Sequence, residues 1–192
     1  MTAPLMPVVT GAGQVEQRPG IAVCGSSGTL DTQRMKRKAQ LVRSACDIAA
    51  VAKRYQNVHH VVFGFSVRRI LYALKIGKLT DFPALEIELD SIEAASKSIQ
   101  RTMSNAGFDG LPRRAKTAIA IRDALEEYSK ALSDAALNLN LICRSLYRES
   151  QGETRFTDYS AGQFRNDRAA YDASVQEFRR WGARLTELFK KF

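Results

Sequence analysis

The fold is decided by residues 121–146, whose sequence is IRDALEEYSKALSDAALNLNLICRSL. Apolar side chains recur in this stretch at alternating intervals of four and three residues: Ile121, Leu125, Tyr128, Leu132, Ala135, Leu139, Ile142 and Leu146. A repeat that averages 3.5 residues places all of them on one face of an α-helix. We predict a helix from Pro112 to about Glu149, on the order of 55 Å long at 1.5 Å per residue. Its apolar seam should pack against other helices at shallow angles.

Similar stripes predict a helix on each side of this segment. Pro83 suits the first turn of a helix that follows the turn at Thr80–Asp81, and Gly107 and Gly110 indicate a loop over 105–112. The apolar stripe of this helix has one polar position, Ser96, and consists of Leu85, Leu89, Ile92, Ile99, Met103 and Ala106. A last helix is predicted from about Asp158 to Lys191, with a stripe that contains Phe164, Tyr171, Val175, Phe178, Leu185, Phe189 and Phe192.

The region before Asp81 predicts two further helices. The first is capped by Asp31 or Thr32, runs to about Asn57, and carries a stripe of Leu41, Ala45, Ile48, Ala52 and Tyr55. His59 and Val62 would extend the stripe if the helix continued. The second spans roughly His60 to Ile76 and ends at Gly77.

The expected fold is all-α, an elongated bundle of about five helices. Residues 1–29 are rich in proline and glycine and predict a flexible or partner-ordered arm, and residues 30–192 predict a single bundle domain. Gly25-Ser26-Ser27-Gly28 follows an apolar run, as in a phosphate-binding loop, but no Lys-Ser/Thr pair follows the second glycine. No strand pattern of useful length occurs after residue 30.

Positive charge is concentrated before Asp81. Residues 1–80 contain twelve Lys or Arg and three acids, whereas residues 81–192 contain seventeen of each, so the first segment carries the whole net charge of +9. Such asymmetry indicates an anionic partner, although a solvated helix face that only keeps the protein in solution would look the same.

Phosphates spaced along a nucleic-acid backbone match cations repeated along a helix. Arg34, Arg37 and Lys38 should share one face, and Lys36 and Arg43 another. The candidate nucleic-acid-binding residues are Arg34, Lys36, Arg37, Lys38, Arg43, Lys53, Arg54, Arg68, Arg69, Arg113, Arg114 and Lys116. We therefore expect a non-enzymatic structural or assembly protein, nucleocapsid- or coat-like, that forms a homo-oligomer and binds nucleic acid, RNA rather than DNA.

Catalytic and metal-binding patterns do not emerge. The two histidines, His59 and His60, are adjacent and point about 100° apart on a helix, so we expect one of them to cap a helix or line a helix junction. Cys46 and Cys143 fall in apolar helical stretches, where thiols are buried and inert. Glu126 and Glu127 resemble solvated surface charges. We expect no enzyme activity, no metal and no cofactor.

Two other interpretations remain open. In the first, the protein is a helical adaptor, chaperone or secretion-associated factor, and the exposed ends of its apolar seams bind a partner helix. In the second, a basic helix over Val58–Lys78 lies on an anionic membrane surface. Arg68 and Arg69 interrupt the longest apolar run, so no transmembrane segment is expected. Three widely spaced cysteines and the lack of a secretory leader favour the cytoplasm, or a particle assembled in a reducing compartment.

Three short elements resemble parts of the coat proteins of rod-shaped plant viruses of the tobamovirus kind: Phe82-Pro83, Arg113-Arg114 and the stretch TAIAIR at 117–122. The resemblance implies a helical bundle that polymerises around RNA. It covers a small part of the chain, the spacing from Phe-Pro to the arginine pair differs from the family pattern, and no functional residue is carried over from it.

Overall fold

The computed structural model describes residues 27–63, 81–106, 116–150 and 161–192. They form four helices: α1 (Ser27–Phe63), α3 (Phe82–Asn105), α4 (Lys116–Ser150) and α5 (Ala161–Phe189). These ranges contain no strand, and the all-α class is confirmed. Residues 1–26 of the arm expected over 1–29, and most of the helix expected over 60–76, lie outside the described residues, so the arm and the count of about five helices stay predictions.

Helix α1 is longer than the sequence indicated. The boundary expected near Asn57 is wrong, because α1 continues to Phe63, and it also begins at Ser27, before the expected caps. The reason lies in packing. Tyr55, Val58 and Val62 are all buried, so the apolar stripe continues without interruption past Asn57 and favours helical backbone there.

The start of α3 is as expected from the turn signal. The Asp81 side chain accepts a hydrogen bond from the Ala84 amide at 3.1 Å, which caps the helix, and Pro83 occupies the first turn. Leu89, Ile92 and Met103 are fully buried. Ser96, the one polar member of the stripe, is also fully buried, and its hydroxyl donates to the Ile92 carbonyl at 2.8 Å.

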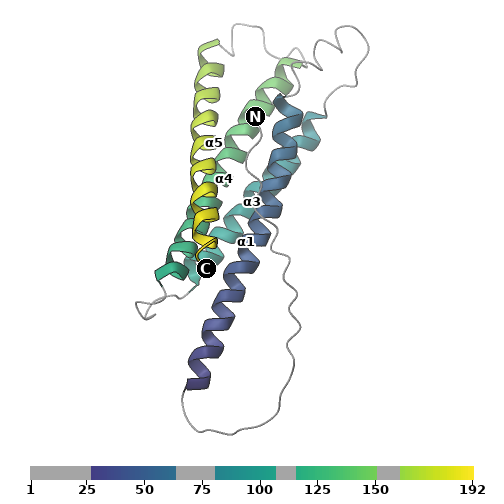
Figure 1. Cartoon of the computed structure of the whole chain (residues 1–192). Coiled ribbons are helices and arrows are strands. Elements are labelled where there is room, and N and C mark those ends of the chain that lie inside the picture. Colours follow the sequence, from purple (N-terminus) through teal and green to yellow (C-terminus); the bar gives the residue numbers. More distant parts are fainter. Residues whose placement is uncertain (1–26, 64–80, 107–115, 151–160) are drawn as a thin grey trace.

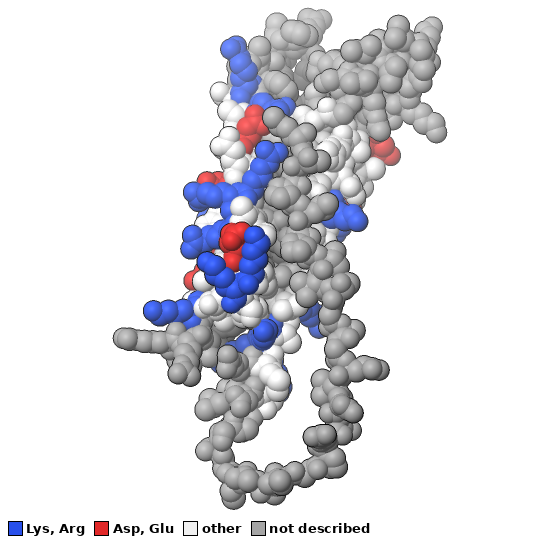
Figure 2. Space-filling view, viewed as in Figure 1, with Lys and Arg blue, Asp and Glu red and all other residues white. Residues whose placement is uncertain are grey.

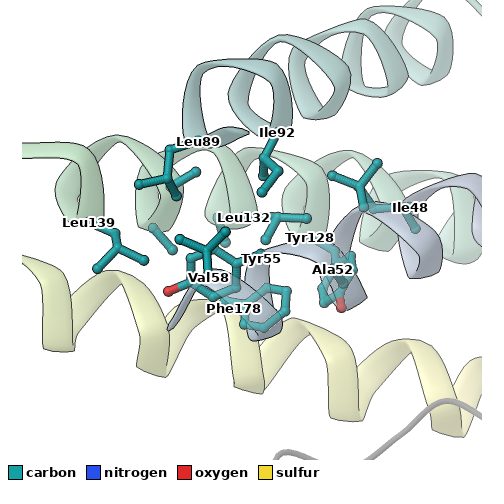
Figure 3. Packing of buried hydrophobic residues seen from close by; sticks show 14 of the residues in the cluster. Ile48, Ala52, Tyr55, Val58, Leu89, Ile92, Tyr128, Leu132, Leu139 and Phe178 are labelled. Atoms are coloured by element: carbon teal, nitrogen blue, oxygen red, sulfur yellow. The ribbon is translucent and has the colours of Figure 1, made fainter. Parts of the chain in front are cut away.

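Helix α4 is the central element, in contact with the other three helices. Seven of the eight seam residues are buried, and only Leu146, near the end of the helix, is half-buried. Small residues beside the seam are buried too, namely Ala124, Ala131, Ala136 and Cys143. Figure 3 shows how α1, α3 and α5 each direct apolar side chains toward α4. The predicted seam is therefore the core of the bundle.

The contacts between helices fix their directions. Helix α3 is antiparallel to α4, because Glu86 contacts Arg144 and Ser104 contacts Glu126. Helix α5 is antiparallel to α1, because Tyr55 contacts Tyr171 whereas Lys38 contacts Phe192.

Helix α4 is likewise antiparallel to α5, since Asn138 contacts Ser174 and the Tyr128 ring lies against Gly182. The N-terminal parts of α1 and α4 and the C-terminal end of α5 therefore lie at the same end of the bundle. The first turns of α1 extend beyond the other helices there (Figure 1).

Candidate nucleic-acid interface

Eight of the twelve candidate cations lie on described helices, and the side chains of seven of them are described. Six of these seven are on α1, and Lys116 is the first residue of α4; the six are Lys36, Arg37, Lys38, Arg43, Lys53 and Arg54. Arg34 belongs to α1, but its side chain lies outside the described part of the chain. Arg68, Arg69, Arg113 and Arg114 also lie outside the described residues.

The α1 cations point in different directions. Lys36, Arg43 and Lys53 are exposed, on the side of the helix opposite the buried stripe. Lys38 points toward α5: its Nζ donates to the main-chain oxygen of Phe192 at 3.3 Å and lies 4.6 Å from the centre of the Phe192 ring. Lys38 and the pair Lys36–Arg43 thus lie on different faces, as the helical spacing predicted.

Arg54 differs from the other cations of α1 because it contacts helix α3. Its Nε lies 2.7 Å from a carboxylate oxygen of Glu88 on α3, and its Nη2 donates to the Ser91 hydroxyl at 2.9 Å. The hydrogen bond to Glu88 raises the pKa of Arg54, and it lowers the pKa of Glu88. Because this ion pair joins two helices, Arg54 is less available to an external phosphate than its exposed neighbours are.

Cations from three helices meet at one end of the bundle. Because α1 and α4 begin where α5 ends, Lys116 lies at the same level as the basic segment of α1. We call this surface the cationic end and define it by Lys36, Arg37, Lys38, Lys116, Lys190 and Lys191. All except Arg37 are exposed. One of these lysines, Lys190, forms an ion pair with Glu187 at 2.7 Å.

Lys190 and Lys191 are absent from the residues predicted from the sequence, because the charge count covered long segments. Residues 81–192 are neutral as a whole, which hides two adjacent lysines that follow the last apolar position of α5. The adjacent pair is a signal that a local count would have found. Its proximity to α1 depends on the antiparallel packing of α5, which no local count reveals.

Several acidic side chains elsewhere form ion pairs with neighbouring cations. Glu86 and Asp90 on α3 lie 3.4 and 3.9 Å from the Arg144 guanidinium. Figure 2 shows Lys and Arg side chains gathered over α5 with acidic side chains among them. Two of these α5 pairs are Arg168–Asp172 and Arg180–Glu177. The cationic end differs from the side of α5 because Lys190 is the only one of its lysines that forms an ion pair with a described residue.

A polar cluster joins α1 to α5 away from the cationic end. Tyr171 is buried, and its hydroxyl is hydrogen-bonded both to the Tyr55 hydroxyl and to Nδ1 of His59. The Arg168 guanidinium lies 4.3 Å from the centre of the Phe63 ring and closes the cluster from α5. His59 therefore lines a helix junction, as expected.

Burial sets the protonation of this cluster. It lowers the pKa of His59, and electrostatic interaction with His60, Arg179 and Arg168 lowers this pKa further, while Asp172 opposes them. Burial likewise raises the pKa of Tyr171 to about 12. The imidazole is neutral near pH 7 and accepts a hydrogen bond from Tyr171. Within the described ranges, no group of three His, Cys, Asp or Glu residues is placed to hold a metal ion.

The two described thiols differ in environment. The expectation of two buried cysteines is wrong for Cys46, which is exposed because it lies on the side of α1 opposite the core. Cys143 is buried, and this burial, together with the charge of Glu86, raises the pKa of its thiol to about 12. Cys143 is therefore a protonated and unreactive core residue.

Comparisons with protein-family models, with curated proteins and with solved structures find no match for this chain. None of the helices in the described part of the chain is long and apolar enough to span a bilayer.

Proposed function

We propose that this protein is a non-enzymatic structural subunit that self-associates and binds nucleic acid, RNA in preference to DNA, through the cationic end. The observation that carries the proposal is the convergence at one end of the bundle of lysines from α1, from α4 and from the residues that directly follow α5. Among the described residues, only Glu187 forms an ion pair with one of these lysines, so the surface has the charge and the breadth to follow a phosphate backbone.

Exposed apolar side chains support self-association. Met35 and Val42 on α1 are 67% and 37% exposed, and Leu137 and Leu141 on α4 are 45% and 44% exposed. Apolar side chains that recur along one helix face gain free energy when a second surface covers them. A coat-like or nucleocapsid-like subunit needs both properties: contacts between copies and a cationic surface that carries no base-specific readout.

The test of nucleic-acid binding compares two triple variants with equal reduction of charge. The first replaces Lys38, Lys116 and Lys191 of the cationic end by Ala. The matched control replaces Arg101, Lys130 and Arg148, which are exposed on α3 and α4, by Ala. Binding of a labelled single-stranded RNA is followed by fluorescence anisotropy across a salt series.

We expect the affinity of the wild type to fall with salt. The cationic-end variant should reduce the slope of log K against log salt by about 0.7 for each phosphate that it no longer neutralises. The control should keep most of the wild-type slope. Absence of binding at low salt, or an equal weakening in both variants, would contradict an interface at the cationic end. The same measurement with DNA of equal length tests the preference for RNA.

A protein-binding adaptor is the second candidate function. Ile87 on α3 is 72% exposed, which is unusual for a large apolar side chain and favours a protein partner. Light scattering separates the two functions: a large or filamentous particle supports the structural subunit, whereas a stable monomer at all concentrations supports the adaptor.

A further inference from the structure

Helix α4 carries a second regular row of side chains on the face that looks away from the core. The row repeats at intervals of three and four residues, and every member is exposed. It consists of Glu127, Lys130, Asp134, Leu137, Leu141, Arg144 and Arg148, and we call it the outer row of α4. No described residue forms an ion pair with Glu127 or Asp134, and the two leucines are nearly half exposed. The row thus begins with two carboxylates separated by Lys130, is apolar in its middle and ends in two arginines.

Helix α1 carries a row with the same spacing and the opposite charge. It lies opposite the buried stripe, and every member is exposed. It consists of Lys36, Ala39, Arg43, Cys46, Ala50, Lys53 and Asn57, and we call it the outer row of α1. No described residue forms an ion pair with Lys36 or Arg43. This row is basic at its start, and small apolar side chains follow.

The two rows are complementary at four of their seven positions when the helices run parallel with residue 36 opposite residue 127. Lys36 then faces Glu127, and Arg43 faces Asp134. One turn further on, Cys46 and Ala50 face Leu137 and Leu141, so small side chains on one helix receive large ones on the other. The repulsion between Lys53 and Arg144 in this register is reduced, because Glu86 and Asp90 lie beside Arg144 and offset its charge.

We propose that the outer row of α4 is a docking surface for the outer row of α1 of a second copy of this chain, in this parallel register. The proposal rests on the self-association proposed above and names its surface. Each row faces away from the core of its own bundle, so the two rows meet only between copies. Charge complementarity and matched side-chain size select the second copy as the occupant.

The consequence for assembly follows from the use of two different surfaces. A contact between unlike surfaces leaves a free α1 row at one side of each pair and a free α4 row at the other. Such heterologous contacts build rings or open filaments instead of closed dimers. Lys38, Lys116 and Lys191 take no part in the contact and stay available at the cationic end.

Charge reversal on each row, followed by mixing, tests the pairing. One double variant carries Glu127→Lys and Asp134→Lys, and the other carries Lys36→Glu and Arg43→Glu. Each should sediment as a monomer where the wild type sediments as larger particles. An equimolar mixture should regain the large particles, because the reversed row of each variant complements the native row of the other.

The outcomes separate the docking surface from the proposed function. Wild-type particles of unchanged size in both variants, or a mixture that stays monomeric although each variant is folded by circular dichroism, would overturn the docking surface while self-association stands. A monomeric wild type would overturn both. RNA binding by the Glu127→Lys, Asp134→Lys variant, measured in parallel, should persist, because this variant leaves every residue of the cationic end unchanged.

A disulfide tests the register itself. In a Cys24→Ser background, Leu137→Cys places a thiol opposite Cys46 of the next copy. Oxidised glutathione accepts the two electrons and two protons released as the two thiols form the disulfide. Non-reducing electrophoresis should then show a ladder of multiples that disappears with Cys46→Ser. The matched control, Leu141→Cys, places its thiol opposite Ala50 and should cross-link at least several-fold less. Equal ladders from both variants, or none from Leu137→Cys, would contradict the register.

Discussion

The hydroxyl of Tyr55 on α1 donates a hydrogen bond to the hydroxyl of Tyr171 on α5, with 2.9 Å between the two oxygens. The backbones of α1 and α5 do not approach each other closely, so long side chains make the contact between these helices. Tyr171 is its centre, because it is also hydrogen-bonded to His59 and stacks on Phe63. Docking of α1 on α5 therefore depends on a few polar and aromatic groups, whereas α4 holds its neighbours by a continuous apolar seam.

Tyr171→Phe should lower the free energy of unfolding by about 1–3 kcal/mol, because it leaves the buried Tyr55 hydroxyl and the half-buried Nδ1 of His59 without their partner. Urea unfolding followed by circular dichroism measures the decrease. Tyr128→Phe is the control, since Tyr128 is equally buried but none of the described residues forms a hydrogen bond with its hydroxyl. Equal decreases in both variants would show that the tyrosine network contributes nothing specific.

Stability should fall as the pH is lowered from 7.5 to 5.5. Burial lowers the pKa of His59 in the folded state, so the unfolded chain binds a proton first, near its ordinary value of about 6.5. Folding is then opposed at and below that pH, and protonation also removes the acceptor at Nδ1. Urea midpoints at several pH values should show this slope, and His59→Gln should flatten it. A wild-type profile independent of pH in this window would contradict the prediction.

Asn140→Leu should raise the free energy of unfolding by about 1 kcal/mol. Asn140 is buried on α4, and its amide donates to Asp90 at 2.6 Å, but its carbonyl oxygen has no hydrogen-bond partner among the described residues. Leucine removes that unsatisfied group at similar volume, and Asp90, which is exposed, is hydrated instead. Asn138→Leu, at a half-buried site bonded to Ser174, should bring no gain. Thermal unfolding of the two variants checks the difference, and a destabilised Asn140→Leu would refute it.

Gly182→Val should cost about 1–3 kcal/mol of stability through overpacking. A Cβ at position 182 would lie 3.2 Å from Cε2 of Tyr128. The Tyr128 ring is stacked on Phe178 with 4.8 Å between centroids, so it has little room to retreat. Ala183→Val, at the next and exposed position of α5, should cost only a few tenths from helix propensity. Urea midpoints of the two variants compare the two stability costs. Similar costs at both positions would argue against a close approach of α5 to α4 at Gly182.

Periodicity in the sequence was sufficient to predict which residues form the core. The seam from Ile121 to Leu146 predicted which face of α4 is buried, and the stripe from Leu85 to Met103 predicted the buried serine at position 96 as well. Both predictions succeed because burial of one helix face depends on spacing along a single element. The end of α1 was predicted wrongly, since continuing apolar contacts at Val58 and Val62 kept the chain helical beyond Asn57.

For the candidate site too, some features were predictable from the sequence and others depended on tertiary packing. The cations of α1 were visible in the sequence because they are neighbours along the chain. The ion pair of Arg54 with Glu88 and the proximity of Lys38 to Phe192 join residues that are 34 and 154 positions apart. Such contacts depend on how far each helix is rotated and shifted along its axis, and the repeat of one helix carries no information about that shift.

The sequence by itself therefore determined the helical class, the seam and the excess of positive charge before Asp81. Tertiary structure alone decided that Lys116, Lys190 and Lys191 join the basic segment of α1, and that Tyr55, His59 and Tyr171 form one network. Burial follows from local spacing, which the chain carries within each helix. The meeting of distant charges and hydroxyls follows from the packing of helices around α4, which exists only once the seam is formed.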